Sequence, residues 1–276
     1  MNRLRFWFLF PARALNGLLF LIPLGIIVLY SFMTRGTYGG QGSPLTIESY
    51  QRLFDPLYLS ILLRSFWIAG ISTAISLLFG FPLALFIATA AKHRGAYLNL
   101  VMLPFWTSFL VRTYAWMFLL RDTGLINTVL QSFGVIGEPI PMLYNDAAVV
   151  LGLVYGYLPF MVLPIYSTLE KVDPALLEAA ADLGATPWVA LWKVIVPLAM
   201  PGIVAGSVLV FIPCLGAYLT PDLLGGGKSI MIGNIVQNQF TSARDWPFGS
   251  ALSLVLTALV MGLLWIFVKK GGQKAL

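Results

Sequence analysis

The chain has 276 residues, of which 59% are hydrophobic and only 10% are charged, and its mean hydropathy is +0.86. Because soluble domains carry about 25% charged residues, this composition excludes a water-soluble protein and predicts a polytopic membrane protein. The net charge of +6 does not indicate nucleic-acid binding, since the basic residues lie at the ends of apolar stretches, where they orient a chain in a membrane.

Six stretches are long and apolar enough to cross a bilayer, which takes about 20 residues of helix. The segment 1–14 that precedes them mixes aromatic side chains with three arginines and is expected to lie along the membrane interface. The predicted fold is therefore an all-α membrane protein with a single transmembrane domain over residues 15–276. In chain order, the predicted spans are 15–33, 65–91, 97–120, 147–169, 201–219 and 249–268.

The orientation follows from the basic residues in the loops. With the N-terminus in the cytoplasm, the inner segments hold ten lysines and arginines and the outer loops hold six. The Lys92-His93-Arg94 turn and the Lys269-Lys270 pair are the clearest signals, and both are placed inside by the positive-inside rule. Both termini are thus predicted to be cytoplasmic. The glycine- and proline-rich stretches 36–44, 134–141 and 221–227 fall in outer loops, where they indicate turns.

The predicted spans lack the groups that ion coupling or catalysis requires. No aspartate or glutamate lies inside them, the only histidine is His93 in a predicted cytoplasmic turn, and the only cysteine is Cys214. Ion-coupled carriers usually hold a carboxylate or histidine at membrane depth, and proteases and metalloenzymes need clustered catalytic or ligating groups. These absences disfavour a self-sufficient carrier and a membrane enzyme, so that energy for uphill transport must come from outside the spans.

Arg112 is the one charge at membrane depth, about nine residues or roughly 13 Å from the outer end of its predicted helix. One interpretation is an anion site or a gate contact. The other is a structural arginine that is bonded to backbone carbonyls or to a carboxylate of a partner subunit. The sequence leaves both open.

The segment Gly225–Ser229 looks like the end of a phosphate-binding loop. The pattern G-x-x-x-x-G-K-S would need glycine at position 222, where the chain has Asp222. The segment is also predicted to face outward, so that nucleotide binding is not expected there.

The cytoplasmic segment 170–200 is too long for a simple hairpin. Asp173-Pro174 provides an N-cap followed by proline at the first helical position, and strong helix formers follow it. Gly184 is expected to end this first helix. Thr186-Pro187 is expected to start a second one. The pattern predicts a helix–glycine–helix elbow, which is suited to sit in a groove of a partner protein and transmit rigid-body motion.

Beyond the second helix, Pro197 and Pro201 are expected to bend the chain into the fifth span. An ordinary interfacial helical hairpin is the alternative interpretation of the whole segment.

Residues of this elbow match a known motif. Glu178-Ala179-Ala180, then Gly184, then Val194-x-Val196-Pro197 fits the spacing E-A-A, three residues, G, nine residues, I-x-L-P, with valine in place of isoleucine and leucine. The motif resembles the EAA loop of binding-protein-dependent ABC importer permeases, and the resemblance extends over nearly the whole chain. The segments Pro104–Trp116, Leu158–Ser167 and Pro221–Lys228 are similar to the spermidine/putrescine branch in particular.

The resemblance implies a type I importer permease (MetI-like) fold with six transmembrane helices in a bacterial inner membrane. It implies as partners a second homologous permease subunit, two copies of a cytoplasmic ATPase and a periplasmic binding protein, and no nucleic acid. ATP and Mg²⁺ would bind to the ATPase, and this chain would hold no cofactor and no metal. The residues that the resemblance places at the ATPase contact are Glu178, Ala179, Ala180, Asp182, Leu183, Gly184, Ala185 and Pro197.

The implied substrate is a polyamine, with opines, aminophosphonate, ferric ion and thiamine as alternatives. A polyamine in transit needs aromatic faces and carboxylates rather than a tight cage. Tyr155 and Tyr157 are two residues apart and should point in different directions, and Arg112 disfavours a cation path that this subunit lines alone. Carboxylates of the partner permease would compensate. The candidate pathway residues are Trp106, Arg112, Tyr114, Trp116, Tyr155, Tyr157, Tyr218 and Asp222.

Overall fold

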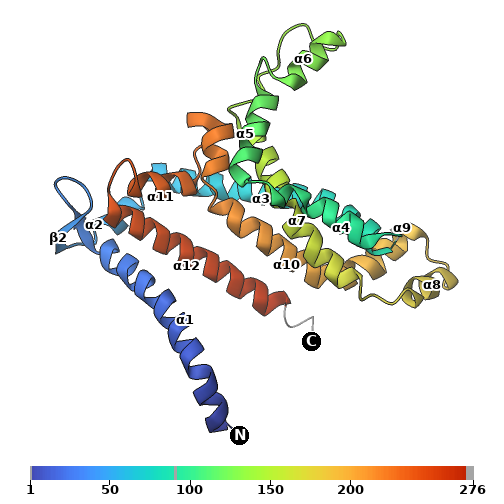
Figure 1. The fold of residues 1–276 in the computed structure, drawn as a ribbon, viewed down its shortest axis with the longest axis horizontal. Coiled ribbons are helices and arrows are strands. Elements are labelled where there is room, and N and C mark those ends of the chain that lie inside the picture. Colours follow the sequence, from blue (N-terminus) through green and yellow to red (C-terminus); the bar gives the residue numbers. More distant parts are fainter. Residues whose placement is uncertain (1, 90–91, 272–276) are drawn as a thin grey trace. The chain divides into compact units, whose positions relative to one another are not determined.

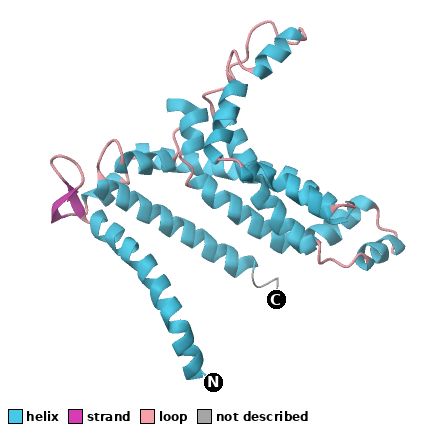
Figure 2. Ribbon diagram, viewed as in Figure 1, coloured by secondary structure: helices cyan, strands magenta, loops and turns pink. Residues whose placement is uncertain are grey.

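The computed structural model describes residues 2–89 and 92–271, and most of these are helical (Figures 1 and 2). The chain forms two compact units, Met1–Leu59 with Ile235–Met261 and Ser60–Asn234 with Gly262–Leu276. The last two residues of the second predicted span and the basic residue Lys274 lie outside the described residues.

The first unit contains a long N-terminal helix, a β-hairpin and the first part of the last helix. The hairpin takes up most of the stretch 36–44 that was expected to form only turns, and its tip holds Gly39 and Gly40 at positive φ. Its elements are α1 (Asn2–Ser31), β1 (Met33–Arg35), β2 (Gln41–Leu45), α2 (Glu48–Arg52), the end of α11 (Ile232–Phe240) and the first part of α12 (Trp246–Gly271). Antiparallel pairing joins β1 to β2 with an irregularity at Met33/Thr34.

A salt bridge connects the two chain segments of this unit. Arg52 Nη1 donates to Asp245 Oδ2 at 2.8 Å, and the Arg52 guanidinium lies 4.1 Å from the centre of the Phe248 ring. The other oxygen of Asp245 accepts from the Phe248 N–H at 3.2 Å at the start of α12. Burial disfavours the charged form of Arg52, but the interactions with Asp245 and Tyr58 together outweigh it and raise the pKa of Arg52.

The second unit holds the remaining elements. They are α3 (Pro56–Thr89), α4 (Arg94–Met102), η1 (Leu103–Trp106), α5 (Phe109–Leu120), α6 (Leu125–Ser132), α7 (Asp146–Leu169), α8 (Ala175–Asp182), α9 (Pro187–Ala190), η2 (Leu191–Ile195), α10 (Val196–Leu215), η3 (Pro221–Gly225), η4 (Gly226–Lys228) and the start of α11. Figure 1 shows α7 and α10 side by side. It also shows α6 in the connection that leads from α5 to α7.

Glycines allow α7 and α10 to pack closely. A Cβ on Gly202 would lie 2.6 Å from the Pro164 carbonyl oxygen, and a Cβ on Gly206 would lie 2.9 Å from the Met161 sulfur. The two glycines are four residues apart and therefore share one face of α10. This is the small-residue spacing through which membrane helices approach each other.

Five helices are long and apolar enough to cross a membrane, within the residues searched: Arg13–Ser31, Pro56–Thr89, Asp146–Leu169, Pro187–Leu215 and Trp246–Trp265. Two of them start well before the predicted spans. Asp55 Oδ1 accepts from the Leu57 N–H at 2.8 Å, so that an Asp-Pro cap starts α3 nine residues before position 65. The helix that contains the fifth predicted span starts before position 201, because it runs without interruption from Pro187.

The third predicted span, 97–120, is not one continuous helix. It is divided into α4, η1 and α5 by an extended backbone at Thr107 and a non-helical Ser108. Pro104 lies just before this break, and proline both lacks an N–H and clashes with the preceding turn of a helix. The apolar composition of 97–120 did not predict this interruption.

Candidate functional site

The first arm of the elbow that was predicted to be cytoplasmic is α8. Asp173 Oδ1 accepts from the Ala175 N–H at 2.9 Å, as expected for a residue that caps a helix. None of the residues of α8 is buried, and Leu183 just after it is 89% exposed. Within the described residues, Glu178 and Asp182 form no ion pair. The arm therefore presents both charged and apolar side chains at its surface.

Gly184 forms the corner of the elbow. Its φ is +79°, a left-handed conformation that side chains other than glycine rarely adopt. The Gly184 N–H donates to Ala181 O at 2.9 Å and the Ala185 N–H to Ala180 O at 3.0 Å, which is the double hydrogen bond of a Schellman C-cap. No atom lies within 4 Å of the position that a Cβ would take. Backbone conformation, rather than space, requires glycine here.

The second arm begins at Thr186, whose hydroxyl accepts from the Val189 N–H at 3.4 Å, with Pro187 at the first helical position. Trp188 and Trp192 are both exposed, and their rings meet edge to face at 5.8 Å. The prediction of a helix–glycine–helix elbow is thus confirmed in its caps and its corner.

The prolines that were expected to bend the chain after the elbow do not interrupt the helix. Both Pro197 and Pro201 lie within helix, because a π-helical turn over Leu191–Ile195 precedes them. The Val196 N–H donates to the carbonyl of Leu191, five residues earlier, and this wider turn makes room for a proline that has no N–H to donate. The second arm is consequently one continuous helix with α10.

The candidate pathway residues do not form a single cluster. Trp116 on α5 and Tyr155 on α7 meet edge to face at 5.5 Å, whereas Tyr157 lies against Phe109 at 6.3 Å. Of the others, Trp106 (75% exposed) lies at the break before α5, Tyr114 on α5 and Tyr218 after α10 are also exposed, and Asp222 is exposed on η3.

Arg112 lies one turn into α5, where its guanidinium is 5.1 Å from the centre of the Phe105 ring and 5.5 Å from that of Phe109. Its Nε and Nη1 atoms are buried and have no hydrogen-bond partner in the part of the chain that the structure describes. The sequence left open whether Arg112 donates hydrogen bonds to backbone carbonyls of its own chain. Over residues 2–89 and 92–271, the structure shows no such hydrogen bond from Nε or Nη1.

The segment 221–227 is not an exposed turn. Pro221, Leu224 and Gly225 are buried, and Leu224 lies so close to α7 that a Cβ on Gly152 would be 2.5 Å from its Cδ1. The glycines at 225 and 226 serve this packing, since a Cβ on Gly226 would meet the Tyr144 ring. Two of the three glycines of the apparent phosphate-loop sequence, Gly225 and Gly226, thus have a structural role.

A charged cluster holds the outer end of α7 to this segment. Asp146 Oδ1 accepts from Arg64 Nη2 at 2.6 Å and from Ser229 Oγ at 2.5 Å. Ser65 Oγ accepts in turn from the Ile232 N–H at 2.8 Å. Sequence reasoning missed this cluster, because its members are 82 or more residues apart along the chain.

The family model for the inner membrane component of binding-protein-dependent transport systems matches residues 6–270. The chain belongs to this family. It is 44% identical over 250 residues to the spermidine/putrescine transport system permease protein PotB of Haemophilus influenzae, covering 90% of this chain and 87% of that one. It is 45% identical over 244 residues to PotB of Escherichia coli, covering 88% of each chain.

The fold matches a solved bacterial ABC transporter that is involved in the import of the polysaccharide alginate, with a TM-score of 0.78 and 18% identity over 99% of this chain and 97% of that one. The type I importer permease fold expected from the sequence is thereby confirmed. The chain is a multi-pass inner-membrane permease, and not an enzyme.

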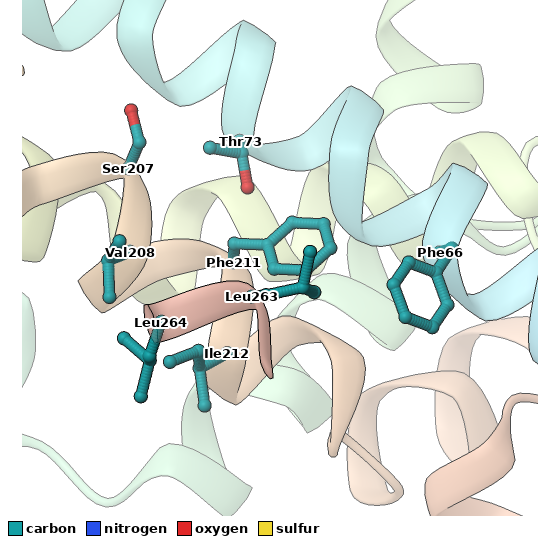
Figure 3. Close-up of a pocket in the computed structure, with 8 residues that line it drawn as sticks. All are labelled: Phe66, Thr73, Ser207, Val208, Phe211, Ile212, Leu263 and Leu264. Atoms are coloured by element: carbon teal, nitrogen blue, oxygen red, sulfur yellow. The ribbon is translucent and has the colours of Figure 1, made fainter. Parts of the chain in front are cut away.

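Within this permease, one apolar cavity of about 280 Å³ lies among α3, α10 and the last part of α12 (Figure 3). The rings of Phe66 and Phe211 meet in it at 5.8 Å. Its lining contains none of the candidate pathway residues and no charged side chain, and consists of Phe66, Thr73, Ser207, Val208, Phe211, Ile212, Leu263 and Leu264.

Proposed function

We propose that this chain is the permease subunit of an ATP-driven importer that takes up polyamines. The proposal rests most on one observation, the continuous helix from Pro187 to Leu215 that begins in the exposed elbow and ends in the packed core. In this assembly the chain pairs with a second homologous permease, two copies of a cytoplasmic ATPase and a periplasmic binding protein.

The elbow couples ATP binding to the membrane helices. The ATPase binds ATP and Mg²⁺, and its closure displaces α8 and the corner at Gly184. Because the second arm is continuous with α10, this displacement passes to α10 without a flexible joint, and α10 carries α7 with it through the contacts of Gly202 and Gly206. The spans then change from inward-open to outward-open. This chain itself binds no nucleotide or metal.

Two lines of support indicate a polyamine. Relatives at 44–45% identity over most of the chain carry the name spermidine/putrescine permease. The aromatic pair Trp116–Tyr155 and the exposed carboxylate of Asp222 offer the weak, releasable cation contacts that such a substrate needs. The segment that carries Asp222 packs against both α5 and α7, so that these groups share the region where a substrate would enter.

The test is uptake into proteoliposomes that contain this chain, its sister permease and the ATPase, with the binding protein outside and ATP inside. We expect radiolabelled spermidine or putrescine to accumulate only when ATP and the binding protein are both present. Uptake without ATP would overturn the importer proposal. ATP-dependent uptake of an opine, aminophosphonate, ferric ion or thiamine, but not of polyamines, would overturn the substrate alone.

A further inference from the structure

The charge of Arg112 is only partly compensated within its own chain. The rings of Phe105 and Phe109 attract the guanidinium, but they offer no oxygen to accept its N–H groups. Nε and Nη1 are buried without a hydrogen-bond partner among the described residues. Such unpaired donors are rare in native proteins and call for an explanation.

This chain offers no carboxylate at the same depth. The six predicted spans contain no aspartate or glutamate. Asp146 pairs with Arg64, and the other acids near the span ends, Asp122, Glu170 and Asp222, form no ion pair with Arg112 in the described structure. A cation left in this state within a membrane is costly, so that we look for its counter-charge outside the chain.

The backbone beside Arg112 gives a second, independent indication. The helix is interrupted at Thr107 and Ser108, and irregular backbone at membrane depth occurs where other protein covers it or where it lines a water-filled cavity, not against lipid. Trp106 and Val111, on either side of this break, are 75% and 60% exposed in the isolated chain. This face is therefore expected to lie against another subunit or a water-filled path, and not against lipid.

We propose that a carboxylate of the second permease subunit pairs with Arg112 across the interface between the two subunits. The carboxylate contacts Nη2 and thereby compensates the positive charge of Arg112, while Nε and Nη1 stay enclosed by this chain. The pair neutralises a charge that would otherwise repel a polycation, and it anchors the two permeases at the break in the third span. This inference rests on the proposed pairing of two permeases.

The first experiment is charge reversal in the purified complex. We expect Arg112→Glu to lower the amount of sister permease that co-purifies with this chain by about tenfold, because it places two carboxylates together in a desolvated interface. Arg112→Lys should retain most of it. The matched control is Arg121→Glu, since Arg121 also lies over a phenylalanine, Phe118 at 4.8 Å, but is exposed at the end of α5.

A second-site selection identifies the partner and guards against a simple folding defect. Uptake lost in Arg112→Glu should return when an acidic residue in a span of the sister permease is changed to lysine or arginine. Restoration by substitutions within this chain alone would overturn the proposal, as would an Arg112→Glu complex that assembles and transports like the unaltered one.

Photo-crosslinking separates this inference from the proposed function. A benzophenone amino acid at Val111 should yield a product that contains the sister permease. A product with lipid alone, in a complex whose two permeases still co-purify, would overturn the pairing of Arg112 and leave the importer intact. Failure of the unaltered permeases to co-purify would instead overturn the proposed assembly.

Discussion

A single backbone angle sets the geometry of the elbow. Gly184 adopts a φ of +79° with empty space around its Cβ position, so that a side chain there meets conformational strain and no steric clash. Small substitutions at Gly184 therefore test the backbone conformation of the corner without changing its packing.

Gly184→Asn should be nearly neutral, because asparagine tolerates the left-handed region, whereas Gly184→Ala should cost about 1 kcal/mol at the corner. Gly184→Val should cost more. We expect the ATPase activity that the permeases stimulate to fall in the same order. The control is Gly134→Ala, which places the same strain (φ +68°, no atoms within 4 Å) in an outer loop and should leave coupling unchanged. Equal losses at both positions would contradict a special role of the elbow.

Two ion pairs at the outer ends of the helices differ in burial, and this difference predicts their contributions to stability. Asp245, paired with Arg52, has a side chain that is 4% exposed, whereas Asp146 and Arg64 are 49% and 39% exposed. Arg52→Met should lower the free energy of unfolding by about 2 kcal/mol, because it leaves a buried carboxylate without its cation. Arg64→Met should lower it by less than about 1 kcal/mol. Thermal unfolding in detergent measures both, and the reverse order would refute the argument.

At the scale of elements, the contact of α7 and α10 depends on glycines that admit no side chain. A Cβ on Gly202 would lie within 3 Å of Pro164 O, Thr168 Oγ1 and Ile165 Cα. Two of these three atoms belong to the backbone, so that they cannot move aside as a flexible side chain can. The helices themselves must separate.

We expect Gly202→Ala to destabilise the permease by about 2 kcal/mol through this overpacking. The matched control is Gly70→Ala in α3, where no atom lies within 4 Å of the added Cβ. This substitution should stabilise the protein by about 0.5 kcal/mol, because alanine favours helix more than glycine does. Melting temperatures of the two variants should shift in opposite directions, and a neutral Gly202→Ala would refute the close contact.

At the scale of the whole molecule, the predicted topology places the hairpin outside and the elbow inside. Tyr38 on the hairpin is 95% exposed and Leu183 on the elbow is 89% exposed, so that each offers an accessible site for labelling. Cys214 is buried and is the only native cysteine. A Cys214→Ala background therefore contains no competing thiol.

In spheroplasts, a membrane-impermeant maleimide should label Tyr38→Cys, and should label Leu183→Cys only after the membrane is permeabilised. Addition of the ATPase to permeabilised membranes should then protect Leu183→Cys if the elbow docks on it. Labelling of Leu183→Cys from outside would overturn the orientation derived from the basic loops.

Residue order alone was enough to predict the class of protein, most of the long apolar helices, and the caps and corner of the elbow. Apolar run length and the local signals of Asp-Pro, Thr-Pro and glycine act over a few residues and can be read without knowing the fold. The break at Thr107, the continuation of the elbow into α10 and the packing of Leu224 on Gly152 were decided by the tertiary structure. The packing of Leu224 depends on a neighbour that is distant in the sequence. At Pro197, local composition does not decide whether the chain leaves the helix or forms a π-turn.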